Sequence, residues 1–180
     1  MGADMLYKEY LSGSTDALEK LVLMYGDKLV MYINGYICDI HESEDILIDV
    51  FAYLVDKRPN IKSGFASYIY KAARNYALMF LRKKKHHIFL TEADADFSVE
   101  NTLEFSAAKN ERNEKLYKCM DMLSPPQKEA LYLVYIEGSS YKEAADVMKK
   151  TVKQIDKLLQ LGKKNLKPLL LKEGITDVFC

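Results

Sequence analysis

Three helix-start signals follow one another between residues 124 and 154, and they constrain the fold more than any other feature of the chain. Each is a capping box, in which a Ser or Thr and a Glu or Gln three residues later each bond the other's backbone amide. The pairs are Ser124 with Gln127, Ser140 with Glu143, and Thr151 with Gln154. The last two enclose a short helix from Tyr141 to Met148 and a longer one from Val152, with a turn at Lys149 and Lys150. This spacing predicts a helix-turn-helix, which places its second helix in the DNA major groove.

The second helix of this predicted motif carries polar side chains that suit a DNA groove. Lysine can reach guanine or a phosphate, and glutamine can pair with adenine. The residues expected to contact duplex DNA are Thr151, Lys153, Gln154 and Lys157. An ordinary helical hairpin with a lysine-coated exterior is the alternative that the same pattern leaves open.

The N-terminal half shows helical spacing and no alternating strand pattern. Apolar residues recur at helical intervals from 18 to 36, behind a candidate cap at Ser14. A second helix is expected from about Ser43 to just before Pro59, and a third begins at Phe65. The chain is therefore predicted to be all-α, with two small helical domains joined by a flexible acidic linker, the C-terminal domain being a helix-turn-helix.

Charge is segregated along a chain that is neutral as a whole. Of its 26 basic and 26 acidic residues, 3 and 11 lie in residues 1–56, whereas residues 57–90 hold 9 basic residues and no acidic one. Cations that follow phosphates and aromatic faces that stack on bases hold single-stranded nucleic acid. The residues that combine these properties are Tyr68, Tyr70, Tyr76, Phe80, Arg74 and Arg82. A solvated basic helix with a buried aromatic side explains the charge but not the missing acids.

Composition also bounds the compartment. No apolar run approaches the roughly 20 residues of a membrane helix, and the N-terminus lacks a basic region followed by an apolar stretch. Cys38, Cys119 and Cys180 are far apart in the sequence, as expected for free thiols in a reducing cytoplasm, and we expect the first two to be buried. The sequence therefore predicts a cytoplasmic protein without membrane insertion.

Catalysis and metal binding find little support in the sequence. His41, His86 and His87 are not spaced with cysteines or carboxylates as a metal site requires, and no phosphate-binding glycine loop is present. We therefore expect no enzyme activity, no metal site and no cofactor.

The two halves together resemble one family, the bacterial RNA polymerase sigma factors of the extracytoplasmic-function (ECF) type. The stretch from Glu44 to Phe51 resembles the helix with which that family docks on polymerase, and the stretch from Phe65 to Asn75 resembles its promoter-melting helix. The sequence from Leu123 through the helix-turn-helix is similar to the family's fourth conserved region.

The resemblance implies an adaptor built from two DNA-contacting parts. It implies a region 2-like domain at residues 1–87, a linker at 88–111 and a region 4-like helix-turn-helix domain at 112–180. The implied partners are core RNA polymerase and promoter DNA, with unpaired bases of the −10 element in the first domain and the −35 duplex in the second. An anti-sigma protein is a further partner that the resemblance leaves open.

The resemblance also implies roles for particular residues. The polymerase-docking residues would be Glu44, Asp45, Leu47, Asp49 and Phe51. Tyr68, Arg74 and Asn75 would capture unpaired bases, and the loop from Asn60 to Gly64 would help to form a base pocket. The full DNA-binding set of the first domain is Asn60, Lys62, Tyr68, Lys71, Arg74, Asn75, Arg82, Lys83, Lys84 and Lys85.

Several positions depart from the family's pattern. Tyr68 stands where tryptophan is usual, Ile48 where glutamine is common, Met79 where aspartate is common, Lys149 where the turn usually has glycine, and Leu161 where arginine is common. These departures leave open whether initiation activity is retained. The alternative function is a helix-turn-helix regulator that binds duplex DNA without acting as a polymerase subunit. That alternative needs only the C-terminal half and leaves the aromatic and basic helix unexplained.

Overall fold

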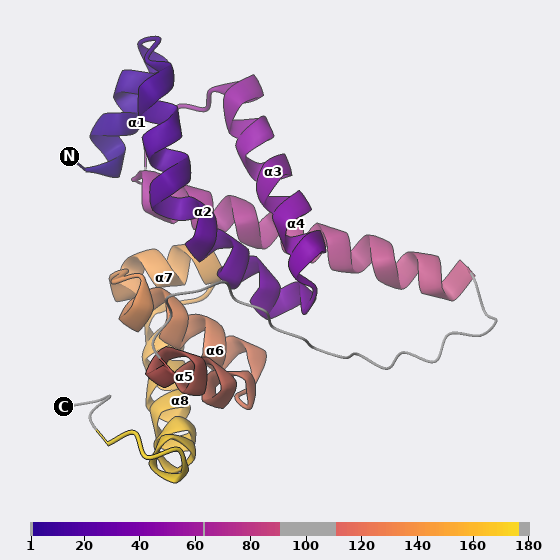
Figure 1. Ribbon diagram of the computed structural model, residues 1–180, viewed down its shortest axis with the longest axis vertical. Helices are drawn as coiled ribbons and strands as arrows, with labels where there is room; N and C mark the ends of the chain where they lie inside the picture. Colours follow the sequence, from indigo (N-terminus) through magenta and orange to yellow (C-terminus); the bar gives the residue numbers. More distant parts are fainter. Residues whose placement is uncertain (1, 63, 91–110, 177–180) are drawn as a thin grey trace. The chain divides into compact units, whose positions relative to one another are not determined.

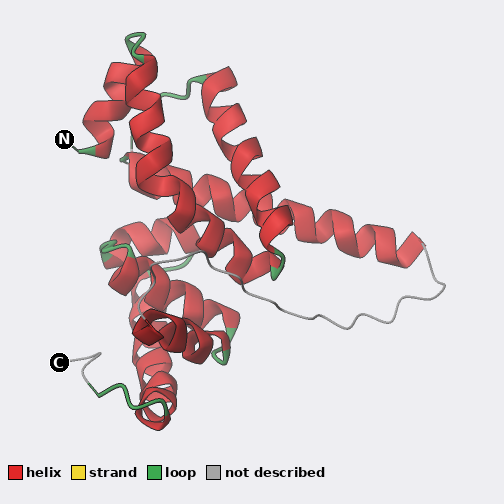
Figure 2. Ribbon diagram, viewed as in Figure 1, coloured by secondary structure: helices red, strands yellow, loops and turns green. Residues whose placement is uncertain are grey.

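Helices account for all of the regular secondary structure in the residues that this computed structural model describes, namely 2–62, 64–90 and 111–176 (Figure 2). The predicted all-α fold is confirmed. The chain divides into two compact units, Met1–Thr102 and Leu103–Cys180. The predicted linker at 88–111 lies mostly outside the described residues, and its two ends belong to helices. No helix in the described ranges is long and apolar enough to cross a membrane.

Four helices build the first unit. They are α1 (Ala3–Leu11), α2 (Thr15–Ile37), α3 (Ile40–Lys57) and α4 (Phe65–Leu90) (Figure 1). Helix α4 packs against each of the other three, and α2 also packs against α1 and α3. The largest fully buried side chains of this unit are Leu21, Leu29, Ile33, Leu54, Phe65, Ile69 and Tyr70. The core therefore lies between α2, α3 and α4, where it fixes one side of α4.

Side-chain caps set the starts of α2 and α3. The Ser14 hydroxyl accepts a hydrogen bond from the Ala17 amide at 3.4 Å, which confirms the predicted cap. Helix α3 begins earlier than predicted, because the Asp39 carboxylate accepts from the Glu42 amide at 3.1 Å. Ser43, the predicted start, is fully buried inside the helix and donates its hydroxyl to the Asp39 carbonyl. The predicted boundary was therefore wrong by about one helical turn.

Helix α1 was not predicted from the sequence. It has only 9 residues, and isolated helices shorter than about 12 residues are marginal in water. Its stability comes from packing, since Leu6, Tyr7 and Tyr10 are all buried. The Tyr7 ring lies 5.2 Å from the ring of Phe65, at the start of α4.

The second unit contains the predicted helix-turn-helix. Its elements are α5 (Glu111–Asp121), α6 (Pro125–Leu131), the π-helix η1 (Tyr132–Ile136), α7 (Tyr141–Met148) and α8 (Val152–Lys172). Ala144 is fully buried and Ala145 is 6% exposed, which confirms that small residues lie where α7 approaches its neighbours. Helix α8 packs against α5, α6 and α7. This packing holds α8 from one side and leaves the other open.

Two of the three predicted capping boxes are confirmed. The Ser140 hydroxyl accepts from the Glu143 amide at 3.2 Å, and the Ser140 amide donates to the Glu143 carboxylate at 2.8 Å. The Thr151 hydroxyl accepts from the Gln154 amide at 3.2 Å, and the Thr151 amide donates to Gln154 Oε1 at 2.8 Å. Helices α7 and α8 therefore begin where the sequence predicts.

The first predicted box does not form. Ser124 makes no side-chain cap bond, although α6 begins at the next residue as expected. The Gln127 side chain instead accepts a hydrogen bond from the Asn165 amide group of α8 at 3.2 Å. Proline at the first helical position, where its fixed φ suits a helix, accounts for the start without the box.

Two backbone positions set how α8 meets the rest of the unit. Lys149 ends α7 in the left-handed conformation with φ of 53°. Gly162 is buried, and a β-carbon there would lie 3.0 Å from a Leu131 methyl group of α6. The small residue at 162 therefore allows α8 to approach α6 closely.

The left-handed turn predicts an unusual substitution effect. Lys149→Gly should raise the free energy of unfolding by about 0.5 to 1 kcal/mol, because glycine adopts positive φ without the steric penalty of a β-carbon. Lys142→Gly, inside α7, should lower it by about as much. Urea denaturation of the two variants measures both effects. A loss of stability in Lys149→Gly equal to that in Lys142→Gly would contradict the strain at Lys149.

Candidate nucleic-acid interface

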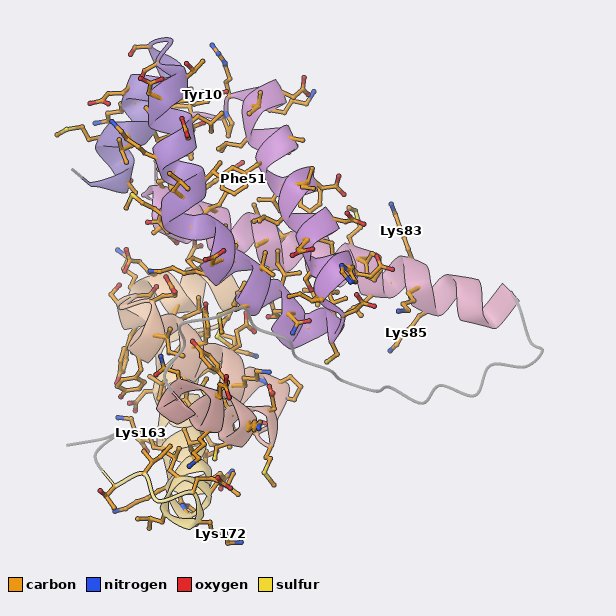
Figure 3. All side chains as sticks on the ribbon, in the orientation of Figure 1. Tyr10, Phe51, Lys83, Lys85, Lys163 and Lys172 are labelled. Atoms are coloured by element: carbon orange, nitrogen blue, oxygen red, sulfur yellow. The ribbon has the colours of Figure 1, made fainter. Side chains whose placement is uncertain are left out.

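The C-terminal half of α4 is a solvated cationic helix. Ala77 is the last buried residue of α4 whose side chain the structure describes. Beyond it, Arg82, Lys83 and Lys85 are exposed. Figure 3 shows Lys83 and Lys85 projecting from opposite sides of the helix. Phosphates can therefore approach this part of α4 from more than one side.

Lys84 is the half-buried member of this basic run. Its ammonium group lies 5.8 Å from the centre of the Phe80 ring. A cation at this distance from an aromatic face is attracted by the electrons of the ring. Phe80 therefore holds Lys84 over one face of its half-buried ring.

Three tyrosines from two helices form a cluster, which we call the tyrosine cluster: Tyr53 of α3 with Tyr68 and Tyr76 of α4. The rings of Tyr53 and Tyr76 lie 6.3 Å apart, edge to face. The Tyr68 hydroxyl shares a hydrogen bond with the Tyr53 hydroxyl. Burial raises the pKa of the Tyr68 hydroxyl, and the neighbouring phenols of Tyr53 and Tyr76 raise this pKa further. The Tyr68 hydroxyl therefore stays protonated and able to donate around neutral pH.

Tyr53 was not among the predicted site residues. It lies on α3, 15 positions before Tyr68 in the sequence, and no local pattern connects the two. It is 39% exposed. The only sequence signal is an aromatic residue on the polar side of α3, four residues after Asp49. The Asp49 carboxylate also raises the pKa of Tyr76, after the larger effect of burial, so the acidic edge of α3 and the tyrosine cluster are neighbours.

Tyr70 does not belong to the interface. It is 1% exposed, and its ring lies 5.0 Å from Tyr32 and 6.4 Å from Tyr25 of α2. The prediction that it offers a stacking face was therefore wrong, because its position on α4 faces the core. Tyr68, two residues earlier, lies on a different side of the helix and is half-buried.

The remaining predicted residues of this unit lie at the surface to different degrees. Asn75 is exposed, and Lys71 and Arg74 are half-buried. Asn60 and Lys62 are exposed in the loop between α3 and α4. All five are accessible on the part of the chain that contains the tyrosine cluster and the cationic end of α4. Their contact with DNA stays a prediction, and their exposure is compatible with it.

Helix α3 presents an acidic face. Glu44, Asp45 and Asp49 are exposed, as predicted, and Leu47 is half-buried. Phe51 is only 9% exposed and belongs to the core, so it cannot anchor a partner in the way that was expected. The apolar periodicity of α3 alone did not distinguish Phe51 from the side chains that point to solvent.

Ile48 takes the place of Phe51 as the apolar residue on that face. Its side chain is 64% exposed. Glu44 and Asp45, four and three residues earlier, lie on the same side of α3, and Asp49 is the next residue. At the sequence level Ile48 was only a departure from the family's pattern. Its exposure makes it the candidate anchor, because a large exposed apolar side chain gains most from burial in an interface.

In the second unit, α8 presents the predicted recognition residues. Thr151, Lys153, Gln154 and Lys157 are all exposed. The Gln154 side-chain oxygen is engaged by the Thr151 amide, so its amide nitrogen is the group left for a base edge. The two lysines, one helical turn apart, lie on one side of α8.

A further cation on α8 was missed by sequence reasoning. The Lys163 ammonium lies 4.5 Å from the centre of the Tyr135 ring of η1. Tyr141, the first residue of α7, makes a hydrogen bond with Tyr135. The pKa of the Tyr141 hydroxyl is raised, and burial is the largest cause. Only the tertiary fold brings these three residues together, because they come from three different elements.

Two of the three cysteines lie within the described residues. Cys119 is buried as expected, and burial raises the pKa of its thiol. Cys38, the left-handed C-cap of α2, is exposed, so the prediction that it is buried was wrong. Cys180 lies outside the described residues. Within the described ranges, no group of three or more His, Cys, Asp or Glu side chains is placed to hold a metal ion.

Sequence relatives agree with this arrangement. The family described as "Sigma-70, region 4" matches residues 113–166, which include the helix-turn-helix. The chain is 25% identical over 162 residues to the ECF RNA polymerase sigma factor SigM of Bacillus subtilis (strain 168), covering 89% of this chain and 98% of SigM. It is 31% identical over 85 residues to SigW of the same organism, covering 46% of each.

Solved structures agree with the fold. The sigma factor RpoE from Bartonella quintana, solved with the anti-sigma factor NepR, superposes with a TM-score of 0.67 at 18% identity, covering 86% of this chain and 96% of RpoE. CnrH, solved with the cytosolic domain of CnrY, gives a TM-score of 0.64 at 17% identity, covering 95% of this chain and 99% of CnrH. In sequence, the chain is therefore similar to bacterial RNA polymerase sigma factors of the ECF type, and its residues 113–166 match the sigma-70 region 4 domain.

Proposed function

We propose that this chain binds core RNA polymerase and directs promoter-specific transcription initiation. The first unit captures unpaired −10 bases, and the second reads the −35 duplex. The observation that carries the proposal is that one unit presents an acidic helix face together with a tyrosine and cation surface, while the other presents a helix-turn-helix. A duplex-binding regulator needs only the second unit. The tyrosine cluster and the cationic end of α4 have no role in that alternative.

Strand capture is the step that the tyrosine cluster supports. Extruding a base costs a few kcal/mol of stacking, and stacking on an aromatic side chain returns about 1 to 3 kcal/mol per base. Tyr68 is half-buried and is bonded to Tyr53, so little rotational freedom remains to be lost when a base stacks on it. Arg82 to Lys85 then hold the phosphates beside the unpaired bases.

Docking on polymerase is assigned to the exposed face of α3. Ile48 supplies the apolar anchor, and Glu44, Asp45 and Asp49 supply an acidic rim that steers a basic partner surface. The Leu47 side chain, half-buried at the edge of this face, extends the apolar contact.

The proposal extends to the remaining partners and to the compartment. The solved structure of RpoE, which has this fold, contains a sigma factor bound to an anti-sigma factor, which supports an anti-sigma protein as a partner of this chain. The proposed activity contains no catalytic step of the chain's own. A protein that works on polymerase and promoter DNA works in the cytoplasm.

The main test is transcription with purified core polymerase on fragmented genomic DNA, with and without this protein. Run-off products that require the protein would identify a promoter. On that promoter, Tyr68→Ala should leave closed complexes nearly intact and reduce permanganate reactivity of thymines near the start site about tenfold or more, since one base stack is lost. Tyr68→Trp and Tyr68→Phe should retain reactivity because each keeps an aromatic face. Normal closed complexes without permanganate signal in the wild type would favour the duplex-binding regulator.

The docking face predicts a separation between stability and binding. Ile48→Ala should weaken co-purification with core polymerase about tenfold or more, with unfolding unchanged. Leu23→Ala, which truncates a residue of α2 that is 77% exposed, is the matched control and should bind normally. Phe51→Ala should lower the free energy of unfolding by about 3 kcal/mol, as expected for truncating a buried aromatic residue. Wild-type binding by Ile48→Ala would remove α3 from the docking proposal.

The recognition helix predicts a salt effect confined to its first turns. Lys153→Ala or Lys157→Ala should reduce the slope of log affinity against log salt by about one unit for each lost phosphate contact. Lys172→Ala is the control, because that lysine is the last residue of the same helix, 19 positions after Lys153. Titrations of the full chain with core polymerase on −35 duplexes measure the slopes. Equal slopes in all three variants would contradict the assignment of Lys153 and Lys157 to phosphates.

A further inference from the structure

Helix α1 holds both ends of the loop between α3 and α4. At one end, the Tyr7 hydroxyl donates a hydrogen bond of 2.7 Å to the Pro59 carbonyl. At the other, the Asp4 carboxylate accepts a hydrogen bond of 2.6 Å from the Phe65 amide. The two contacts join residues that are 52 and 61 positions apart in the sequence. Between the two anchored ends lie the exposed side chains of Asn60 and Lys62.

Asp4 supplies a cap that α4 cannot make for itself. Gly64 precedes the helix with φ of 88° and has no side chain with which to bond the first free amides. A carboxylate at this position is also favoured by the helix dipole. A β-carbon at Gly64 would lie 3.8 Å from the Asp4 carboxylate oxygen. The loop therefore enters α4 through a conformation that needs glycine at 64 and an acceptor from α1.

Tyr7 links the loop to the tyrosine cluster as well. Its ring packs on Phe65 at 5.2 Å, and its phenol is near enough to that of Tyr68 to raise the pKa of Tyr7. Burial has the largest effect and brings the pKa of Tyr7 to about 12. Tyr7 therefore stays protonated at neutral pH and keeps donating to the Pro59 carbonyl.

We propose that Asp4 and Tyr7 are positioning residues for −10 recognition, which fix the α3–α4 loop so that Asn60 and Lys62 meet unpaired bases in one arrangement. This inference rests on the proposed function, since it concerns the same DNA surface. Neither residue touches DNA. Their effect is on discrimination between bases, because a loop held in one conformation presents one set of hydrogen-bonding groups, whereas a loosened loop can adapt to several bases.

The structure provides a matched control on α1 itself. Tyr10 is 3% exposed and Tyr7 is 4% exposed, and the two rings lie 6.0 Å apart. The Tyr10 hydroxyl has no hydrogen-bond partner among the described residues. Tyr10→Phe therefore removes a hydroxyl without breaking a bond to the loop and keeps the ring over which Arg58 lies. Tyr7→Phe makes the same chemical change and breaks the bond to Pro59.

The experiment uses the full chain with core polymerase and the promoter found by run-off transcription. Open-complex formation is measured on that promoter and on versions with one −10 base changed, and the ratio gives base discrimination. Tyr7→Phe and Asp4→Ala should lower this ratio about fivefold, the effect of losing one hydrogen bond. Asp4→Asn, which keeps an acceptor oxygen, and Tyr10→Phe should stay within about twofold of the wild type.

Hydrogen exchange of the protein alone gives a second readout that needs no polymerase. The Phe65 amide should exchange faster in Asp4→Ala than in Asp4→Asn or Tyr10→Phe. An unchanged discrimination ratio in Tyr7→Phe and Asp4→Ala, with only the melting temperature lowered, would overturn the proposal and leave α1 a purely structural helix. A wild-type chain that forms no open complex on any promoter would overturn the proposed function itself, and with it this inference.

Discussion

The burial of one stripe of α4 is the constraint on which the first unit depends. The stripe consists of Phe65, Ser67, Ile69, Tyr70, Ala73 and Ala77. Each of α1, α2 and α3 packs against α4, so the rotation of this helix about its axis is set by the whole core. Once that rotation is set, the outward positions follow from the helical period. The same packing that stabilises the unit therefore decides which aromatic and basic side chains reach solvent.

The aromatic residues of α4 have different structural roles, although they lie in one segment of similar composition. Tyr70 is buried in the core, whereas Tyr68 and Tyr76 contact Tyr53 at the surface. Phe80 lies under the Lys84 ammonium. Composition and spacing predicted a nucleic-acid surface in this region, but they treated its aromatic residues as equivalent. Separating them needs the direction of the core, which is known only once α2 and α3 are in place.

Local signals predicted the starts of α2, α7 and α8, where the capping interaction is itself local, but the equally local cap of α3 at Asp39 was missed. The boxes at Ser140 and Thr151 close over a single turn, so the sequence contains both partners. The predicted box at Ser124 does not form, and the Gln127 side chain bonds to Asn165 of α8 instead. Helix α1 was missed because its stability comes from contacts with residues that are distant in the sequence. Phe51 was assigned outward for a related reason, since its burial depends on packing that the α3 pattern does not specify.

The run of four consecutive cations at Arg82 to Lys85 has a consequence for the folded chain without DNA. Like charges spaced three or four positions apart on a helix repel each other, and in this run Arg82 and Lys85 stand in that relation. Ions in solution screen this repulsion over a length of about 8 Å at physiological ionic strength. Added salt therefore acts in two opposite directions on one segment, favouring its helical conformation while competing with the phosphates that the same side chains bind. Helicity of this segment in isolation and its affinity for DNA should respond to ionic strength with opposite signs.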